Sequence, residues 1–172
     1  MPPLLDWILS LPQAFPGLRL ELLGGLLLAT ILGGAIGWER ELAQKPAGLR
    51  TNILICVAAT LLTDLSVQAA ASATVAADPG RIAAQIVTGV GFLGAGTIIQ
   101  SRGTVTGLTT AATLWIVAAI GMAIGFGALV EAAGTTMLVL VALIPLRRFE
   151  LRIEALRGGR RATDKPVDPP AE

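Results

Sequence analysis

Residues 108–126 read LTTAATLWIVAAIGMAIGF and contain no charged side chain. A helix needs roughly 17–25 mainly apolar residues to cross the hydrocarbon core of a bilayer. Within lipid, a helix also satisfies every backbone donor and acceptor inside one segment, and the alternating pattern of a barrel strand is absent from this chain. The stretch therefore predicts a transmembrane helix.

Four further apolar windows lie along the chain, and its composition agrees with a membrane protein. Hydrophobic residues make up 53% of the 172 residues and charged residues 15%, whereas a soluble domain carries about 25% charged residues. The sequence thus predicts an all-α, polytopic transmembrane helical bundle. Its five spans are expected at residues 22–38, 53–71, 82–99, 108–126 and 129–146.

The basic residues are shared unequally between the two faces that five spans create. The first loop, the third loop and the C-terminal tail would hold all of the 13 Lys and Arg residues except Arg19 and Arg81. Cytoplasmic loops carry an excess of Lys and Arg. The sequence therefore predicts an external N-terminus and a cytoplasmic C-terminus, and an even number of spans would scatter the same charges across both faces.

The two ends of the chain are expected to flank the bundle, which occupies residues 22–146. Residues 1–21 are interrupted by prolines and have no basic region ahead of an apolar core, so they predict an external interfacial segment rather than a cleavable signal. Residues 147–172 predict a basic cytoplasmic tail, which is amphipathic at first and disordered after Gly158.

The scarcity of reactive side chains limits the chemistry available to this chain. It contains no histidine, and its single cysteine, Cys56, has no disulfide partner and is expected to pack inside its span. Most metal sites and nucleophilic mechanisms need these residue types. A net charge of +1 offers no concentrated basic face for nucleic acid. The sequence predicts a protein that is not an enzyme and has no cofactor, and it leaves a metal site open.

Two helical hairpins of the predicted bundle resemble each other. Residues 48–51, GLRT, open the second span and residues 107–110, GLTT, open the fourth, and VAA at 57–59 recurs at 117–119. Both hairpins would cross the membrane in the same direction, which predicts a parallel two-hairpin repeat followed by a fifth helix. The alternative is chance similarity among residues that are common in membrane helices. A repeat would bring two polar loops together at the cytoplasmic side.

The glycines of the predicted spans suit close helix packing. Residues 89–94, GVGFLG, match a dinucleotide-binding fingerprint by letter, but they lie inside an apolar span without the strand and the later acid that this site requires. Small residues let two membrane helices approach closely, so the glycine-rich third span is expected to be the central helix. The glycines predicted to pack are Gly33, Gly37, Gly89, Gly91, Gly94, Gly96, Gly121 and Gly125.

The first cytoplasmic loop is the richest polar stretch near the membrane. Pro46 and Gly48 predict a turn, after which Thr51 or Asn52 could accept from the first amides of the next helix. One interpretation is a capped turn with interfacial ion pairs, and the other is a functional polar cluster that includes the third loop. The predicted cluster consists of Glu39, Arg40, Arg50, Thr51, Asn52, Gln100, Arg102, Thr109 and Thr110.

Asp64 is an acidic residue near the middle of the second predicted span. An ionised carboxylate there costs about 2.5–3.5 kcal/mol. Thr60 and Gln68 share its helix face. Two interpretations remain open: a protonated, hydrogen-bonded carboxyl group, or a carboxylate that lines a wet cavity with a cation. Glu131, near the outer surface, is expected to be exposed.

Five segments together carry a family resemblance: ERE at 39–41, AGLRTN at 47–52, RIAAQIV at 81–87, GVGFLGAG at 89–96 and GLTTAATLW at 107–115. Over about residues 24–127, the chain resembles the MgtC/SapB family. This resemblance implies a multi-pass protein of the bacterial inner membrane, linked to growth at low magnesium and to survival of pathogens inside macrophages. It also implies restraint of the membrane ATP synthase rather than transport of magnesium. Long members add a soluble C-terminal domain, whereas this chain resembles a short form with a charged tail.

The leading hypothesis is a non-enzymatic membrane protein that modulates another membrane complex or ion homeostasis. Its expected partners are the lipid bilayer and either another membrane protein or a second copy. The alternative, based on Asp64 and the repeat, is a small Mg²⁺ transporter or channel subunit that would need to oligomerise. A weaker alternative is an enzyme that acts on lipid through Glu39 and Arg50.

Overall fold

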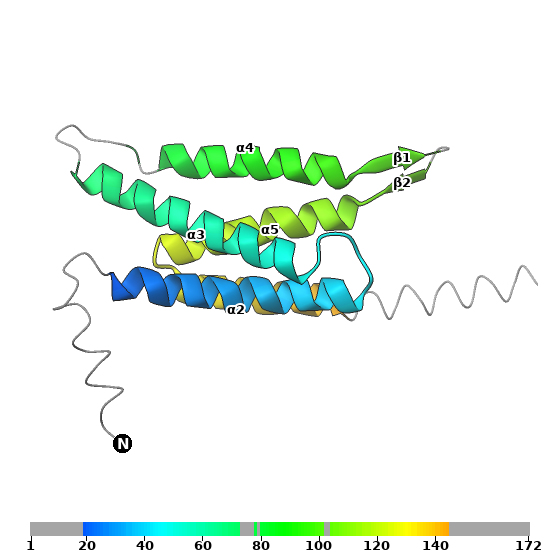
Figure 1. Ribbon diagram of the computed structural model, residues 1–172, viewed down its shortest axis with the longest axis horizontal. Helices are drawn as coiled ribbons and strands as arrows, with labels where there is room; N and C mark the ends of the chain where they lie inside the picture. Colours follow the sequence, from blue (N-terminus) through cyan, green and yellow to red (C-terminus); the bar gives the residue numbers. More distant parts are fainter. Residues whose placement is uncertain (1–18, 73–77, 79, 102–103, 145–172) are drawn as a thin grey trace, which may run out of the picture.

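The computed structural model describes residues 19–72, 78, 80–101 and 104–144. Four labelled helices and one hairpin of strands are followed by a further helix, Leu129–Ile144. The labelled elements are α2 (Leu20–Leu42), α3 (Leu49–Ser72), α4 (Gly80–Thr97), β1 (Ile99–Ser101), β2 (Thr104–Thr106) and α5 (Leu108–Gly125). Successive helices run in opposite directions along one bundle (Figure 1). The predicted all-α membrane bundle is confirmed.

The two ends of the bundle differ in structure. One end, here called the hairpin end, carries the antiparallel strands β1 and β2 and the turn of residues 43–48 between α2 and α3 (Figure 1). The other, here called the Arg19 end, carries the start of α2. The hairpins α2–α3 and α4–α5 run in the same direction, but a short turn joins the first pair and the strands join the second (Figure 1).

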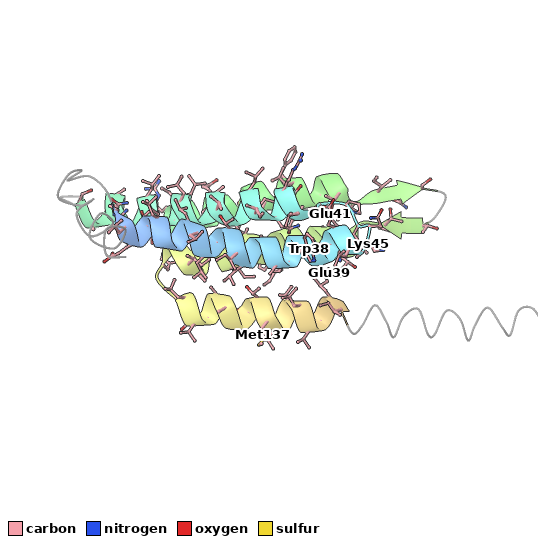
Figure 2. The ribbon with its side chains drawn as sticks, turned by 60° about the horizontal axis from the view of Figure 1, so that its bottom comes forward. Trp38, Glu39, Glu41, Lys45 and Met137 are labelled. Atoms are coloured by element: carbon pink, nitrogen blue, oxygen red, sulfur yellow. The ribbon has the colours of Figure 1, made fainter. Side chains whose placement is uncertain are left out.

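The burial of the side chains fits a bundle surrounded by lipid. Asn52, Thr60 and Thr63 are at most 1% exposed, whereas Leu138 and Met137 are 72% and 71% exposed. Met137 lies on the outer side of the helix Leu129–Ile144 (Figure 2). A protein folded in water buries its large apolar side chains, but membrane helices contact one another through small and polar residues. The protein is therefore a membrane protein.

Three helices of the described part, α2, α3 and α5, are long and apolar enough to cross a bilayer, and the helix Leu129–Ile144 is apolar but shorter. The count of five spans stays a prediction. The third span was expected to end at residue 99, but α4 ends at Thr97, because Ile99 pairs with Thr106 across the strands. The segments predicted at residues 1–21 and 147–172 lie, apart from residues 19–21, outside the described residues.

The prediction that the third span is the central helix is wrong. Helices α3 and α5 each contact the three other labelled helices, whereas α4 packs on α5 and α3. Only Ile86, Val90 and Gly94 of α4 are buried. Glycine content shows where a close approach is possible, but the neighbouring helix must supply a matching surface, and α4 has a neighbour on one side only.

Four glycines lie where two helix backbones nearly touch. A Cβ atom would lie 2.7 Å from the Cβ of Cys56 at Gly33, 2.7 Å from the Cα of Leu49 at Gly37, and 2.6 Å from the Cβ of Thr63 at Gly125. Gly121 faces the carbonyl of Cys56 as closely. These contacts hold α3 between α2 and α5.

The glycines of α4 differ from those of the other helices. Gly94 packs at ordinary distance on Ala111, 3.5 Å from its Cβ. Gly89, Gly91 and Gly96 have no heavy atom of the described residues within 4 Å of a Cβ position. The described residues therefore do not give these three glycines the predicted packing role, because they lie on the exposed side of α4.

Candidate functional site

The turn between α2 and α3 is held by two side chains. Glu41 Oε2 accepts from the first amide of α3 at 3.1 Å, and Asn52 Nδ2 donates to the carbonyls of Ala47 and Gly48 at 2.6 and 2.8 Å. The predicted cap by Thr51 or Asn52 is wrong, because α3 begins at Leu49 and both residues already lie inside the helix. Asn52 instead donates back to the turn, where it is fully buried.

Arg40 is the centre of the polar contacts at the hairpin end. It lies in the last turn of α2, is 3% exposed, and donates from Nη2 to Thr110 Oγ1 on α5 at 3.4 Å. Its Nη1 lies 3.7 Å from Oε2 of Glu39, which is 8% exposed. A buried charge is costly unless it is paired, so the guanidinium and the carboxylate stabilise each other while Arg40 connects α2 to α5.

A cavity of about 630 Å³, here called the hairpin-end cavity, opens beside Arg40. Figure 2 shows Trp38, Glu39, Glu41 and Lys45 together at this end of the molecule. The walls come from the end of α2, the turn, the strands, the start of α5 and the helix Leu129–Ile144. They consist of Glu39, Arg40, Lys45, Pro46, Thr97, Ile99, Val105, Thr106, Gly107, Leu108, Thr109, Thr110, Ala142 and Leu143.

The structure divides the predicted polar cluster into three groups. The residues that line the hairpin-end cavity are Glu39, Arg40, Thr109 and Thr110. Asn52 is buried under the turn, and Arg50, Thr51 and Gln100 are exposed and do not line the cavity. Arg102 lies outside the described residues. The pairing of Glu39 with Arg50 that the enzyme hypothesis needed is not present, because Arg50 lies on the exposed side of α3.

Sequence reasoning missed several residues of this cavity. Lys45 and Pro46 lie in the first predicted loop, where the sequence assigns Pro46 to the turn and gives Lys45 no role in a site. Thr97 and Thr106 reach the cavity because β1 and β2 fold back on each other and bring the end of α4 to the start of α5. The alternation of TVT at residues 104–106 is the one local signal for a strand, and it is too short to predict a hairpin.

At the Arg19 end, Asp64 forms an ion pair with Arg19. Arg19 Nη1 bonds to Oδ2 and Nη2 bonds to Oδ1 at 2.9 Å, and Gln68 Nε2 also donates to Oδ2, at 2.6 Å. The hydrogen bonds that Arg19 donates to Asp64 raise the pKa of the Arg19 guanidinium. The sequence had placed Arg19 only as a charge on the outer face, and nothing in its spacing pointed to Asp64.

A second cavity, of about 660 Å³, lies at the Arg19 end. Arg19, Glu21, Thr60 and Asp64 contribute its polar side chains. Thr60 Oγ1 lies 2.9 Å from the carbonyl oxygens of both Cys56 and Gly121, so it can donate to either and join α3 to α5.

Between the two cavities the bundle is closed by its apolar core. The core residues there are Ala29, Ile36, Cys56, Val117 and Ile120, all at most 1% exposed. In the described part of the chain, no three His, Cys, Asp or Glu residues are grouped so that they could hold a metal ion. The burial of Cys56 agrees with its predicted packing role, and Glu131 is exposed.

Comparison with known proteins gives one family. The model of the MgtC family matches residues 26–152. Protein MgtC of Salmonella typhimurium strain LT2 is 48% identical over 132 residues, which cover 76% of this chain and 54% of that protein. The Escherichia coli K12 protein named "Putative magnesium transporter YhiD" is 51% identical over 106 residues, 59% of this chain and 49% of that protein.

An uncharacterized protein of Haemophilus influenzae is 44% identical over 124 residues, 69% of this chain and 52% of that protein. The chain thus spans about half the length of these relatives. No solved structure matches.

Proposed function

Because the chain belongs to the MgtC family, we propose that it is a multi-pass protein of the bacterial inner membrane that serves magnesium homeostasis by modulating another membrane protein. In this proposal its own bundle does not conduct the ion, and the protein is not an enzyme. The name of the relative from Escherichia coli supports the link to magnesium. The membrane bundle supports the location.

One observation carries the choice of a modulator over a carrier: the core between the two cavities is apolar and closely packed. A conduction path needs polar groups or water along its length, and the side chains of Ile36, Val117 and Ile120 fill this space. The carboxylate of Asp64, the one acid near the middle of a predicted span, is already engaged by Arg19 and Gln68. The hairpin end, with the buried pair Glu39 and Arg40, is the proposed contact region for the partner.

The test combines growth with reconstitution. A strain without the gene is complemented with the unchanged protein, with Arg40→Gln or with Glu131→Gln, and growth is followed at limiting magnesium. Arg40→Gln should lose complementation although the protein still inserts, because it removes the buried pair with Glu39 that shapes the proposed contact region. The exposed Glu131→Gln should complement fully. In proteoliposomes, the unchanged protein should show no Mg²⁺ flux above empty vesicles. Flux that exceeds this background, or full complementation by Arg40→Gln, would overturn the proposal.

The second candidate is a magnesium transporter, favoured by the name of the relative from Escherichia coli and by the Arg19-end cavity with Asp64 in its wall. This function requires a path between copies, because the core of one copy is closed. It predicts flux in proteoliposomes that disappears in Asp64→Asn and persists in Glu131→Gln. Equal flux in both variants would exclude a role of Asp64 in transport.

A further inference from the structure

We propose that the hairpin-end cavity binds a phosphate diester that carries a primary ammonium group, the headgroup chemistry of an ethanolamine phospholipid. The phosphate would lie at the start of α5 beside Arg40, and the ammonium would lie at Glu39. This inference goes beyond the proposed function. It concerns the same hairpin end, but its tests measure lipid binding rather than growth or Mg²⁺ flux, so either proposal can fail without the other.

The start of α5 supplies backbone donors for an anion. The first hydrogen bond of this helix is donated by the amide of Ala111, to the carbonyl of Gly107, and no side chain caps the helix. The amides of Leu108, Thr109 and Thr110 therefore have no partner within the helix, and their dipoles favour a negative group. All three residues line the cavity.

Arg40 and Lys45 add positive charge near the start of α5. Arg40 is buried and lies 3.4 Å from Thr110 Oγ1, so its guanidinium is held at the first turn of α5. Lys45 adds an exposed ammonium from the turn and also lines the cavity. A guanidinium and helix amides together match the oxygens of a phosphate group.

Glu39 is the observation that points to a positive group on the same ligand. Its Oε2 is buried and accepts no hydrogen bond from a described residue, and the guanidinium of Arg40 at 3.7 Å lies beyond hydrogen-bond distance. A buried carboxylate oxygen without a donor is costly. A primary ammonium supplies three N–H donors, whereas a quaternary ammonium supplies none.

The surroundings of the cavity favour a lipid as the source of this headgroup. Leu108, Ile99 and Val105 line it and are 58%, 62% and 46% exposed, so apolar surface adjoins the polar pocket. Trp38, 58% exposed, lies next to Glu39 at the same end of α2 (Figure 2), and tryptophan is enriched at the level of the headgroups. Acyl chains could therefore lie along the bundle while the headgroup occupies the cavity.

The experiment compares three lipids with identical acyl chains on the purified full-length chain in detergent. Phosphatidylethanolamine, phosphatidylcholine and phosphatidylglycerol are titrated separately, and bound lipid is counted by native mass spectrometry. The ethanolamine lipid should bind about tenfold more tightly than the choline lipid, a difference of about 1.4 kcal/mol. Glu39→Gln should abolish this preference, and the matched variant Glu131→Gln, which alters an exposed carboxylate outside the cavity, should keep it. Equal binding of the two lipids, or a preference that survives in Glu39→Gln, would overturn the proposal.

A second pair of variants tests the phosphate position without changing a buried residue. Lys45→Gln should weaken the binding of all three lipids by a similar factor, about threefold at low salt, because each lipid carries a phosphate. Arg50→Gln removes the same charge from an exposed residue outside the cavity and should leave binding unchanged. Equal effects of the two substitutions would refute the phosphate position.

Soluble glycerophosphoethanolamine, a phosphate diester like the lipid headgroup, distinguishes a lipid from a soluble ligand. If the ligand is a lipid, millimolar glycerophosphoethanolamine should not displace phosphatidylethanolamine. Displacement at concentrations comparable to the lipid would overturn the assignment to a lipid.

Discussion

Replacing Gly33 by alanine tests the close packing of α2 on α3. The new methyl carbon would lie 2.7 Å from Cys56 Cβ and 2.9 Å from the carbonyl oxygen of Asn52. Carbon atoms in contact prefer about 3.5–4.0 Å, so the first contact is roughly 0.8 Å too short. Both neighbours belong to α3, one of them is backbone, and Cys56 is fully buried. The helices must therefore separate.

The expected loss of stability in Gly33→Ala follows from comparison with the same substitution at Gly89. Forcing an extra methyl group into a packed contact costs about 1–3 kcal/mol. The gain in helix propensity from glycine to alanine is the same at both positions, about 1 kcal/mol in water. At Gly89 no heavy atom of the described residues lies within 4 Å of the Cβ position. The difference between the two variants should then be about 1–3 kcal/mol, which is roughly a 5- to 160-fold change in the folded ratio.

The assay is reversible unfolding in mixed micelles with increasing denaturing detergent, followed by the fluorescence of the three tryptophans. The midpoint for Gly33→Ala should fall below that of the unchanged protein, and the midpoint for Gly89→Ala should equal or exceed it. Equal midpoints for the two variants would refute the close approach of α2 and α3. A larger loss at Gly89 would refute the exposed position of this side of α4.

Three further predictions follow from the ion pair, the turn and the orientation. Arg19→Gln should destabilise the protein more than Asp64→Asn, because it leaves a carboxylate without its cation in α3. The double variant should recover part of this loss, and strictly additive losses would contradict the pairing. Asn52→Ala should cost about 1–3 kcal/mol in the same unfolding assay, since both bonds to the turn disappear, and an unchanged midpoint would contradict their contribution. For the orientation, the native cysteine is removed and a new one is placed on each side. Asp78→Cys should react with an impermeant maleimide on whole cells, whereas Gln44→Cys should react only after the membrane is opened. The opposite pattern would reverse the predicted orientation.

The polar cluster shows how far residue types alone could predict the site. Glu39, Arg40, Thr109 and Thr110 do meet at one cavity, because the loops that follow α2 and precede α5 lie at the same end of the bundle. Arg50 does not join them. A helix places successive side chains about 100° apart, so a residue in the correct loop can still point away from the site.

Asp64 shows the opposite case, because the sequence predicted that this residue needs a partner but did not identify the partner. Its position in an apolar span made an interaction necessary, but the sequence could not say which one. Arg19 is 45 residues away along the chain and pairs with Asp64 because α2 and α3 form an antiparallel hairpin. The start of the first helix and the later part of the second therefore meet at the Arg19 end.

The sequence alone determined that the protein folds in lipid, that it is an all-α bundle, and approximately where its helices begin and end. Lipid requires each crossing segment to be apolar and to satisfy its own backbone, and both properties can be recognised in one segment at a time. Only the tertiary structure decided that α3 and α5 rather than α4 are central, which glycines touch a neighbour, and which charges meet. Those outcomes depend on the rotation and register of one helix against another. In lipid, hydrophobicity does not distinguish the packed face of a helix from its exposed face, so close packing and the pairing of a few polar groups choose between them.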